Sequence, residues 1–200
     1  MLMKRKRKNI GVFVVVLILG LGAIGAILAY GAHVSANIHR RFVHERYHTA
    51  ERLYRATVGQ NILENHPQNP RELMEFYTDS FFLLHGDFIV CDDIFMEVIE
   101  FQRALFSPSL LTGTTAQQQF DRLKANLEAL GEEGNMLLRR PVVDNIRHDF
   151  YDQRTALAYV IHPFMFHADL YRVYHLIMDD NDRWLINSWS LADADFNIIN

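Results

Sequence analysis

The side chains best suited to chemistry lie in one predicted strand, residues 166–178. His167, Asp169 and His175 share one face of this strand, because side chains alternate between the two faces of a strand. Imidazole and carboxylate groups so arranged could bind a metal ion or transfer protons. The other face is mostly apolar and is the better candidate for the core. We therefore expect the three polar residues to point away from the core, where they need no catalytic role.

Arg172 is the one charged residue on that apolar face. A buried guanidinium needs a partner, because an unpaired charge away from water costs free energy. The partner could be an Asp or Glu of a helix, which is the interpretation we favour, or an acidic ligand. We expect Arg172, Tyr174 and Tyr159 to line the interior of the domain.

Motifs that would identify a reaction are missing from the sequence. It contains no Gly-rich phosphate loop, His-Glu-x-x-His motif, nucleophile elbow or zinc-type ligand spacing. Cys91 is the only cysteine, which excludes an internal disulfide and a zinc site built on cysteines. Its apolar neighbourhood predicts a small buried residue. We therefore predict no catalytic residues, no cofactor and no metal site.

Charge is distributed unevenly along the chain. Residues 4–8 are all basic, whereas the segment after Ala36 carries 15 basic and 24 acidic residues. A domain with this net negative charge has no electrostatic reason to bind phosphates, so we predict no binding to nucleic acid.

An uncharged segment follows the basic residues. Residues 10–32 run for 23 positions without a charge. At about 1.5 Å per residue, this length exceeds the roughly 30 Å of bilayer hydrocarbon. We predict a transmembrane helix over 10–32 and a cytoplasmic tail over 1–9, because basic flanks stay inside. The chain would then be a single-pass protein of the cell membrane, with its C-terminal domain outside. Cleavage near Ala36, as in a signal peptide, is the alternative.

The remaining residues predict helices followed by strands. We assign residues 33–68 to a stalk helix and linker, and residues 69–200 to the domain outside the membrane. Apolar residues at helical spacing predict helices capped by Asn69, by Asp92 or Asp93, and by Thr114 or Thr115. Segments rich in β-branched and aromatic residues predict strands over 142–151, 155–162, 166–178 and 183–191.

Short connections between these strands predict an antiparallel sheet with helices on one face, which is an α+β fold. The helix after Thr115 is expected to bury Leu123 and Leu127 in one core with Leu170, Tyr174 and Leu176 of the sheet.

This order of elements resembles the NTF2-like superfamily. The strand ending Tyr174 to Met178, an acidic turn and the segment Arg183 to Trp189 are similar to the last hairpin of that family. Membrane-anchored NTF2-like proteins of Gram-positive bacteria are more similar still in outline over residues 1–191, through the helix start Pro70-Arg71-Glu72 and the segment Gln102 to Phe106. The resemblance implies a cone-shaped fold, with helices packed on a curved antiparallel sheet. It implies no reaction, because the Asp-His or Tyr-Asp set of the family's enzymes cannot be matched here position by position.

Three functions remain open from the sequence. The favoured one is a membrane-anchored binding or assembly module, because NTF2-like domains offer a cone for ligands and a sheet for partners. The alternatives are a VirB8-like subunit of an export or conjugation channel and a small enzyme of isomerase, dehydratase or hydrolase type. All three are drawn from the fold.

The strand face opposite Arg172 is a candidate interface. Tyr171, Val173 and Ile177 would form an exposed apolar patch there, which predicts a homodimer or a partner protein of the cell envelope. The alternative is that the C-terminal segment with Phe196 folds back over the patch.

Overall fold

The computed structural model describes residues 48–62, 64–86, 88, 91–133, 137–164 and 168–199, and the side chains of these except residues 130–133. All of them belong to one compact unit, residues 46–200. The predicted cytoplasmic tail, the transmembrane helix over 10–32 and the first part of the stalk lie outside the described residues. Within the described residues, no helix is both long enough and apolar enough to span a bilayer.

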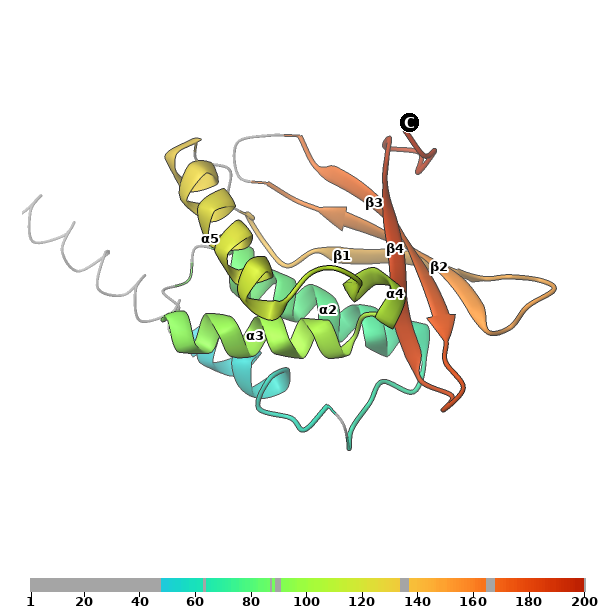
Figure 1. The fold of residues 1–200 in the computed structure, drawn as a ribbon. Helices are drawn as coiled ribbons and strands as arrows, with labels where there is room; N and C mark the ends of the chain where they lie inside the picture. The colour runs from blue at the N-terminus through green and yellow to red at the C-terminus, as the bar shows by residue number, and fades with distance from the viewer. Residues whose placement is uncertain are drawn as a thin grey trace, which may run out of the picture. The chain divides into compact units, whose positions relative to one another are not determined.

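Helices come first in the described chain and strands follow (Figure 1). Residues 48–56 are helical. The remaining elements are α2 (Pro70–His85), α3 (Asp92–Ala104), α4 (Pro108–Leu111), α5 (Ala116–Glu133), β1 (Val142–His148), β2 (Thr155–His162), β3 (Leu170–Met178) and β4 (Trp184–Ala192). The α+β prediction is confirmed.

Polar side chains fix the starts of two helices where the sequence predicts them. Asn69 Oδ1 accepts a 3.0 Å hydrogen bond from the Glu72 N–H, and Pro70 occupies the first position of α2. Thr115 Oγ1 accepts a 3.2 Å bond from the Gln118 N–H, whose own side chain accepts 3.0 Å from the Thr115 N–H. This reciprocal pair is a capping box.

The start of α3 differs from the prediction. Cys91 precedes the helix without a side-chain cap, and Asp92 and Asp93 lie in the first turn instead. Their carboxylates still stabilise the start of α3, because the N-terminus of a helix carries the positive end of its macrodipole. Cys91 is exposed, so the prediction of a buried cysteine is wrong. It directly precedes the first turn of α3, where Asp92 and Asp93 are exposed as well.

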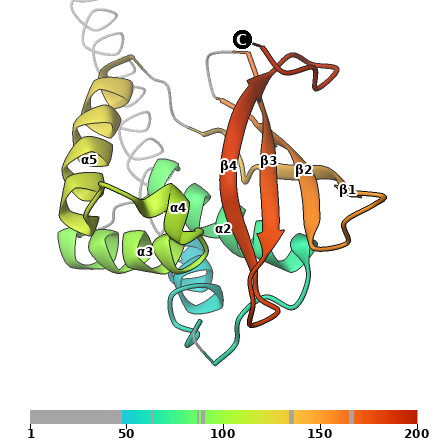
Figure 2. The same ribbon diagram turned by 45° about the vertical axis from the view of Figure 1, so that its right-hand side comes forward.

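The four strands form an antiparallel sheet in the order β1-β2-β3-β4. Register shifts leave Asp144 of β1 unpaired against β2, and Asn187 of β4 unpaired opposite His175 and Leu176 of β3. Such bulges bend strands, and Figure 2 shows the resulting bend in β4. All of the labelled helices lie on one side of the sheet in that view.

The core has two parts. Helix α2 packs directly on the sheet, where Leu73, Met74 and Tyr77 meet Tyr174 and Leu176. Helix α3 packs on α2, and α5 packs on α3.

Because α5 packs mainly on α3, Leu123 belongs to a second cluster centred on Val98 and Ile99. The prediction that Leu123 and Leu127 share a core with the sheet is therefore wrong, and Leu127 is half-buried.

Candidate functional site

A cleft of about 390 Å³ opens on the helix-bearing side of the sheet. It is bounded by α2, α3, the region of α4, α5, β3 and β4. These segments are distant in the sequence, and the cleft exists because α5 lies on α3 and leaves the adjoining part of the sheet uncovered.

The floor of the cleft comes from α2 and β3. Tyr77, Phe81 and His85 follow one another at intervals of four residues, so they lie on one face of α2. Arg172 enters from β3 on the same side as Tyr174, because the two are separated by two strand positions. The structure therefore places Arg172 and Tyr174 on the same face of β3, toward the interior.

Arg172 is surrounded by aromatic groups and not by carboxylates. Its guanidinium carbon lies 5.8 Å from the centroid of the Phe81 ring. Burial lowers the pKa of Arg172, but the neighbouring hydroxyls of Tyr174 and Tyr77 outweigh this effect and the net change is a rise. Its buried Nε has no hydrogen-bond partner. The predicted Asp or Glu partner is not found among the described side chains.

Two histidines lie beside this guanidinium. The Tyr174 hydroxyl is 3.1 Å from His162 Nε2, while the buried Nδ1 of His162 has no partner. Burial lowers the pKa of His162 to about 3, and the charge of Arg172 adds to the effect. Burial likewise lowers the pKa of His85 to about 4. Both imidazoles are therefore neutral near pH 7.

The tautomer of His85 follows from its hydrogen bond. His85 Nδ1 lies 3.1 Å from the carbonyl oxygen of Phe81, which can only accept. Nδ1 therefore carries the proton, and Nε2 keeps a free lone pair on the side chain that lines the cleft.

Tyr77 of the floor and the buried Tyr174 beside Arg172 both remain protonated. Burial raises the pKa of Tyr77 well above its ordinary value. Burial also raises the pKa of Tyr174, although the Arg172 charge opposes it. Near neutral pH the floor thus combines one fixed positive charge with neutral hydroxyl and imidazole groups.

The upper walls of the cleft combine apolar and basic side chains. Trp189 of β4 is 44% exposed and contacts Phe106, with 6.5 Å between the ring centroids. Arg103 donates to Gln119 Oε1 at 3.1 Å and to the Thr114 carbonyl at 2.8 Å, which holds the start of α5 against α3. The described residues around the cleft are Tyr77, Phe81, His85, Gln102, Arg103, Phe106, Leu110, Leu111, Thr114, Gln119, Arg122, Leu123, Asn126, Arg172 and Trp189.

Tyr159, the third residue expected to line the interior, lies on the opposite face of the sheet. It pairs with Val173 across β2 and β3, whereas its neighbour Ala158 pairs with Tyr174. Its ring contacts Phe196 at 5.1 Å between centroids. The structure therefore places Tyr159 with the candidate interface and not with Arg172.

That candidate interface is partly covered by the end of the chain. Phe196 contacts Tyr171 at 5.4 Å between ring centroids, and Val173 is only 2% exposed. Tyr171 and Ile177 are half-buried. This arrangement is the alternative in which the C-terminal segment folds back over the patch.

The His-Asp-His set of the third strand lies only partly within the described residues. Asp169 and His175 are described, and His167 lies outside the described residues. Among the residues that the structure describes, no group of three His, Cys, Asp or Glu side chains is arranged to hold a metal ion.

A second hollow of about 540 Å³ lies beside the hairpin between β1 and β2. Exposed residues such as Arg147, Asp149 and Phe150 form much of its lining. None of its described lining residues has a buried polar atom without a partner. The cleft above Arg172 is therefore the better candidate.

Sequence reasoning missed several residues of the cleft, although some carried a signal. His85 continues the stripe of Tyr77 and Phe81 by one helical turn, and His162 alternates inward with Ala158 and Val160 in β2. Nothing in the sequence indicated that the basic residues of the walls would line a cleft, because exposed arginines are common on helices.

Comparison with known proteins identifies a family without an assigned activity. The profile of a family described as "Domain of unknown function (DUF6715)" matches residues 3–189. No curated protein and no solved structure matches the chain at a significant level.

Proposed function

From its membership of the DUF6715 family and the geometry above, we propose that this chain is a membrane-anchored binding module that takes a small molecule into the cleft above Arg172. The observation that carries the proposal is Arg172, which lines a cleft of about 390 Å³ and whose buried Nε has no hydrogen-bond partner among the described residues. Binding pockets for small molecules are typically of this size, with apolar walls and a few convergent polar groups. A polar atom left without a partner in such a place is one that a ligand can satisfy.

The fold we propose for this module is the NTF2-like cone. Helices that precede a four-stranded antiparallel meander, and that pack on one face of it, support this assignment. The bulges in β1 and β4 support it too, because they supply the curvature that a cone needs.

The location we propose follows from the sequence. Residues 10–32 would span the cell membrane, and the basic residues 4–8 would hold the N-terminus in the cytoplasm. The domain over 69–200 would then bind its ligand outside. A reporter fused after Asn200 should be active outside the cell, and activity inside would contradict this orientation.

A ligand screen on the full chain in uncharged detergent micelles tests the binding function. Compounds in the cleft should raise the melting temperature of the wild type by a few degrees, because a ligand at about 100 times its Kd adds about 2.7 kcal/mol. Leu123→Trp should abolish the shift by filling the cleft. Leu138→Trp is the matched control, since Leu138 is 57% exposed and does not line the cleft.

The screen has one result that would contradict the proposal. If every stabilising compound acts equally on the wild type and on Leu123→Trp, the cleft is not a binding site.

The small-enzyme alternative has one observation in its favour, the free Nε2 of His85 in the cleft. A neutral imidazole near a bound ligand could accept a proton. An enzyme would convert a compound found in the screen, whereas a binding module would release it unchanged. The VirB8-like alternative would instead use the outer face of the sheet, and crosslinking to other envelope proteins through that face would favour it.

A further inference from the structure

The lining of the cleft has an unbalanced charge. Arg103, Arg122 and Arg172 line it, and none of the lining residues whose side chains the structure describes is Asp or Glu. This contrasts with the chain after Ala36, which carries 24 acidic residues and only 15 basic ones. A basic cleft in an acidic domain attracts an anion locally, since low-dielectric walls concentrate the field of the charges that line them.

The arginine of the floor has the geometry to bind an acidic group. The guanidinium is planar and can offer parallel N–H donors to a carboxylate. Arg103 is already engaged by Gln119 and Thr114, whereas Arg172 Nε has no partner. The hydroxyls of Tyr77 and Tyr174 beside it are neutral and leave its charge uncompensated.

The walls above Arg172 are suited to an apolar body. Trp189 and Phe106 form one aromatic surface, and Leu110 and Leu123 also line the cleft. Inorganic anions have nothing to place against such walls. Burial of an apolar body there would contribute through the hydrophobic effect, at roughly 25 cal/mol per Å² removed from water.

We infer that the cleft binds a small organic acid, whose carboxylate pairs with Arg172 while its apolar body contacts Trp189 and Leu123. Arg122, on the exposed side of α5, would add attraction at the mouth without a fixed contact. This inference rests on the proposed binding function and names the chemical class of its ligand.

Calorimetric titration of the full chain in uncharged detergent micelles tests the inference with three probes. These are 3-phenylpropionate, its neutral amide and inorganic phosphate. We expect the acid to bind at least about tenfold more tightly than the amide or phosphate, because a charge-assisted pair with Arg172 contributes at least about 1.4 kcal/mol.

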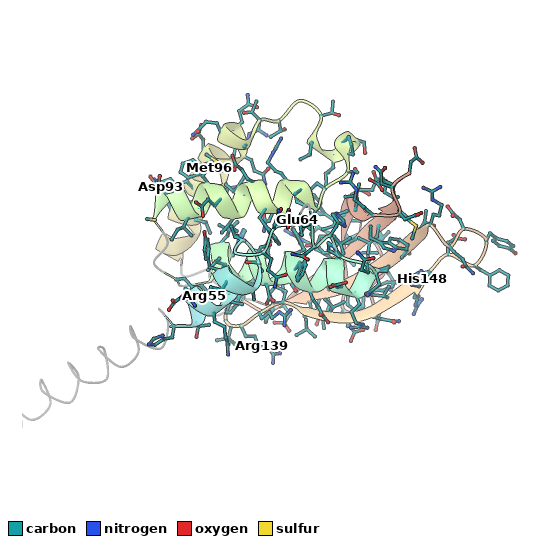
Figure 3. The ribbon with its side chains drawn as sticks, turned by 90° about the horizontal axis from the view of Figure 1, so that it is seen from below. Arg55, Glu64, Asp93, Met96, Arg139 and His148 are labelled. Carbon is teal, nitrogen blue, oxygen red and sulfur yellow. The ribbon has the colours of Figure 1, made fainter. Side chains whose placement is uncertain are left out.

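Variants of the cleft residues then test whether the acid binds in the cleft. Arg172→Met should weaken binding of the acid at least about tenfold and leave that of the amide unchanged. Arg122→Gln should weaken it about twofold, in a way that added salt removes. Arg139→Gln is the control and should have no effect, because Arg139 is exposed, does not line the cleft and is visible in Figure 3.

Several results would overturn the inference. They are equal binding of acid and amide, binding of phosphate as tight as that of the acid, no binding of the acid at millimolar concentration, or an unchanged affinity in Arg172→Met. Should a neutral compound of the ligand screen still bind in the cleft, the binding function would stand while the anion assignment falls. If Arg172→Met fails to fold, Arg172→Lys takes its place, and it should weaken binding because an ammonium lacks the planar fork.

Discussion

The two faces of the sheet are covered in different ways. On the inner face, Tyr174 and Leu176 are covered by α2, an element far away in the sequence. On the outer face, Tyr159 and Tyr171 are covered by Phe196, which belongs to the short segment directly after β4. A cleft remains beside α2 on the inner face, whereas the outer face is covered by a local turn of the chain.

The outer cover depends on a few backbone contacts. Phe196 has φ 59°, a left-handed conformation that is rare for a bulky residue. Asp193 holds this turn, since its Oδ1 accepts from the Asn197 N–H at 2.8 Å and from the Asp195 N–H at 3.0 Å. The comparison indicates that the inner face has a fixed structure on which a site can be built, while the outer face is closed by a segment that small changes can release.

The largest effect is expected from the inner face. Leu176→Ala should lower the free energy of unfolding by about 3 kcal/mol, because Leu176 is 1% exposed and its removal leaves a cavity between the sheet and α2. Its neighbour Ile177 points to the outer face and is half-buried. Ile177→Ala should cost about 1 kcal/mol. Urea unfolding of both variants measures the difference, and equal losses would mean that the two faces are equally well packed.

The next effect concerns acid stability. Burial lowers the pKa of His162 to about 3 and of His85 to about 4, below the ordinary 6.5. Below pH 6.5 the unfolded chain binds protons that the folded chain does not, so the free energy of unfolding falls as the pH falls toward these values. His162→Gln should reduce the loss of stability between pH 7 and pH 5 by about 2 kcal/mol.

The matched control for this prediction is His148→Gln. His148 is exposed at the end of β1, as Figure 3 shows. Urea unfolding at both pH values compares the two variants with the wild type. A pH dependence that is the same in all three chains would mean that His162 is not a buried neutral imidazole.

The sequence allowed the elements to be predicted better than their contacts. Strand alternation and turn residues are local, so three predicted strands, 142–151, 155–162 and 183–191, agree with β1, β2 and β4 to within a few residues. Tyr159 was misplaced because its face depends on the register between β2 and β3, where it pairs with Val173. That register is set by long-range packing.

The cleft could not be predicted for a related reason. An apolar stripe on α5 indicates that the helix packs on something, but not whether that is the sheet or α3. Arg172 was recognised as unusual on its strand, yet only the packing of α5 on α3 shows that it faces a cleft. Local patterns thus specified the polar residue, and tertiary contacts specified its surroundings.

A smaller effect on stability is expected at the outer face. Phe196→Ala should cost about 1 kcal/mol, because the ring is only half-buried, in the segment after β4. It should also expose Tyr159 and Tyr171, and an apolar patch of this kind favours association. Sedimentation in density-matched detergent should show a wild-type monomer and a dimer of Phe196→Ala, and adding Tyr171→Glu should restore the monomer. A wild-type monomer at high micromolar concentration would contradict the homodimer predicted from the sequence, and a monomeric Phe196→Ala would mean that the uncovered patch does not drive association either.

The smallest effect on stability is expected for the contacts between an arginine and an aromatic ring, one of which occurs on each face of the sheet. Arg147 places its guanidinium carbon 5.1 Å from the centroid of the Tyr159 ring, and Arg172 lies 5.8 Å from that of Phe81. Arg147 is exposed, so water compensates for much of what the contact contributes. Arg147→Met should therefore cost less than about 0.5 kcal/mol in urea unfolding at pH 7, since the methionine keeps the apolar stem against the ring. Arg172→Met should also cost little without ligand, because removing a buried charge that has no carboxylate partner relieves its desolvation. If Arg172→Met, but not Arg147→Met, lowers the free energy of unfolding by more than about 2 kcal/mol, Arg172 stabilises the fold. The inner face would then differ from the outer face in stability, and Arg172 could not be explained as a residue kept for binding.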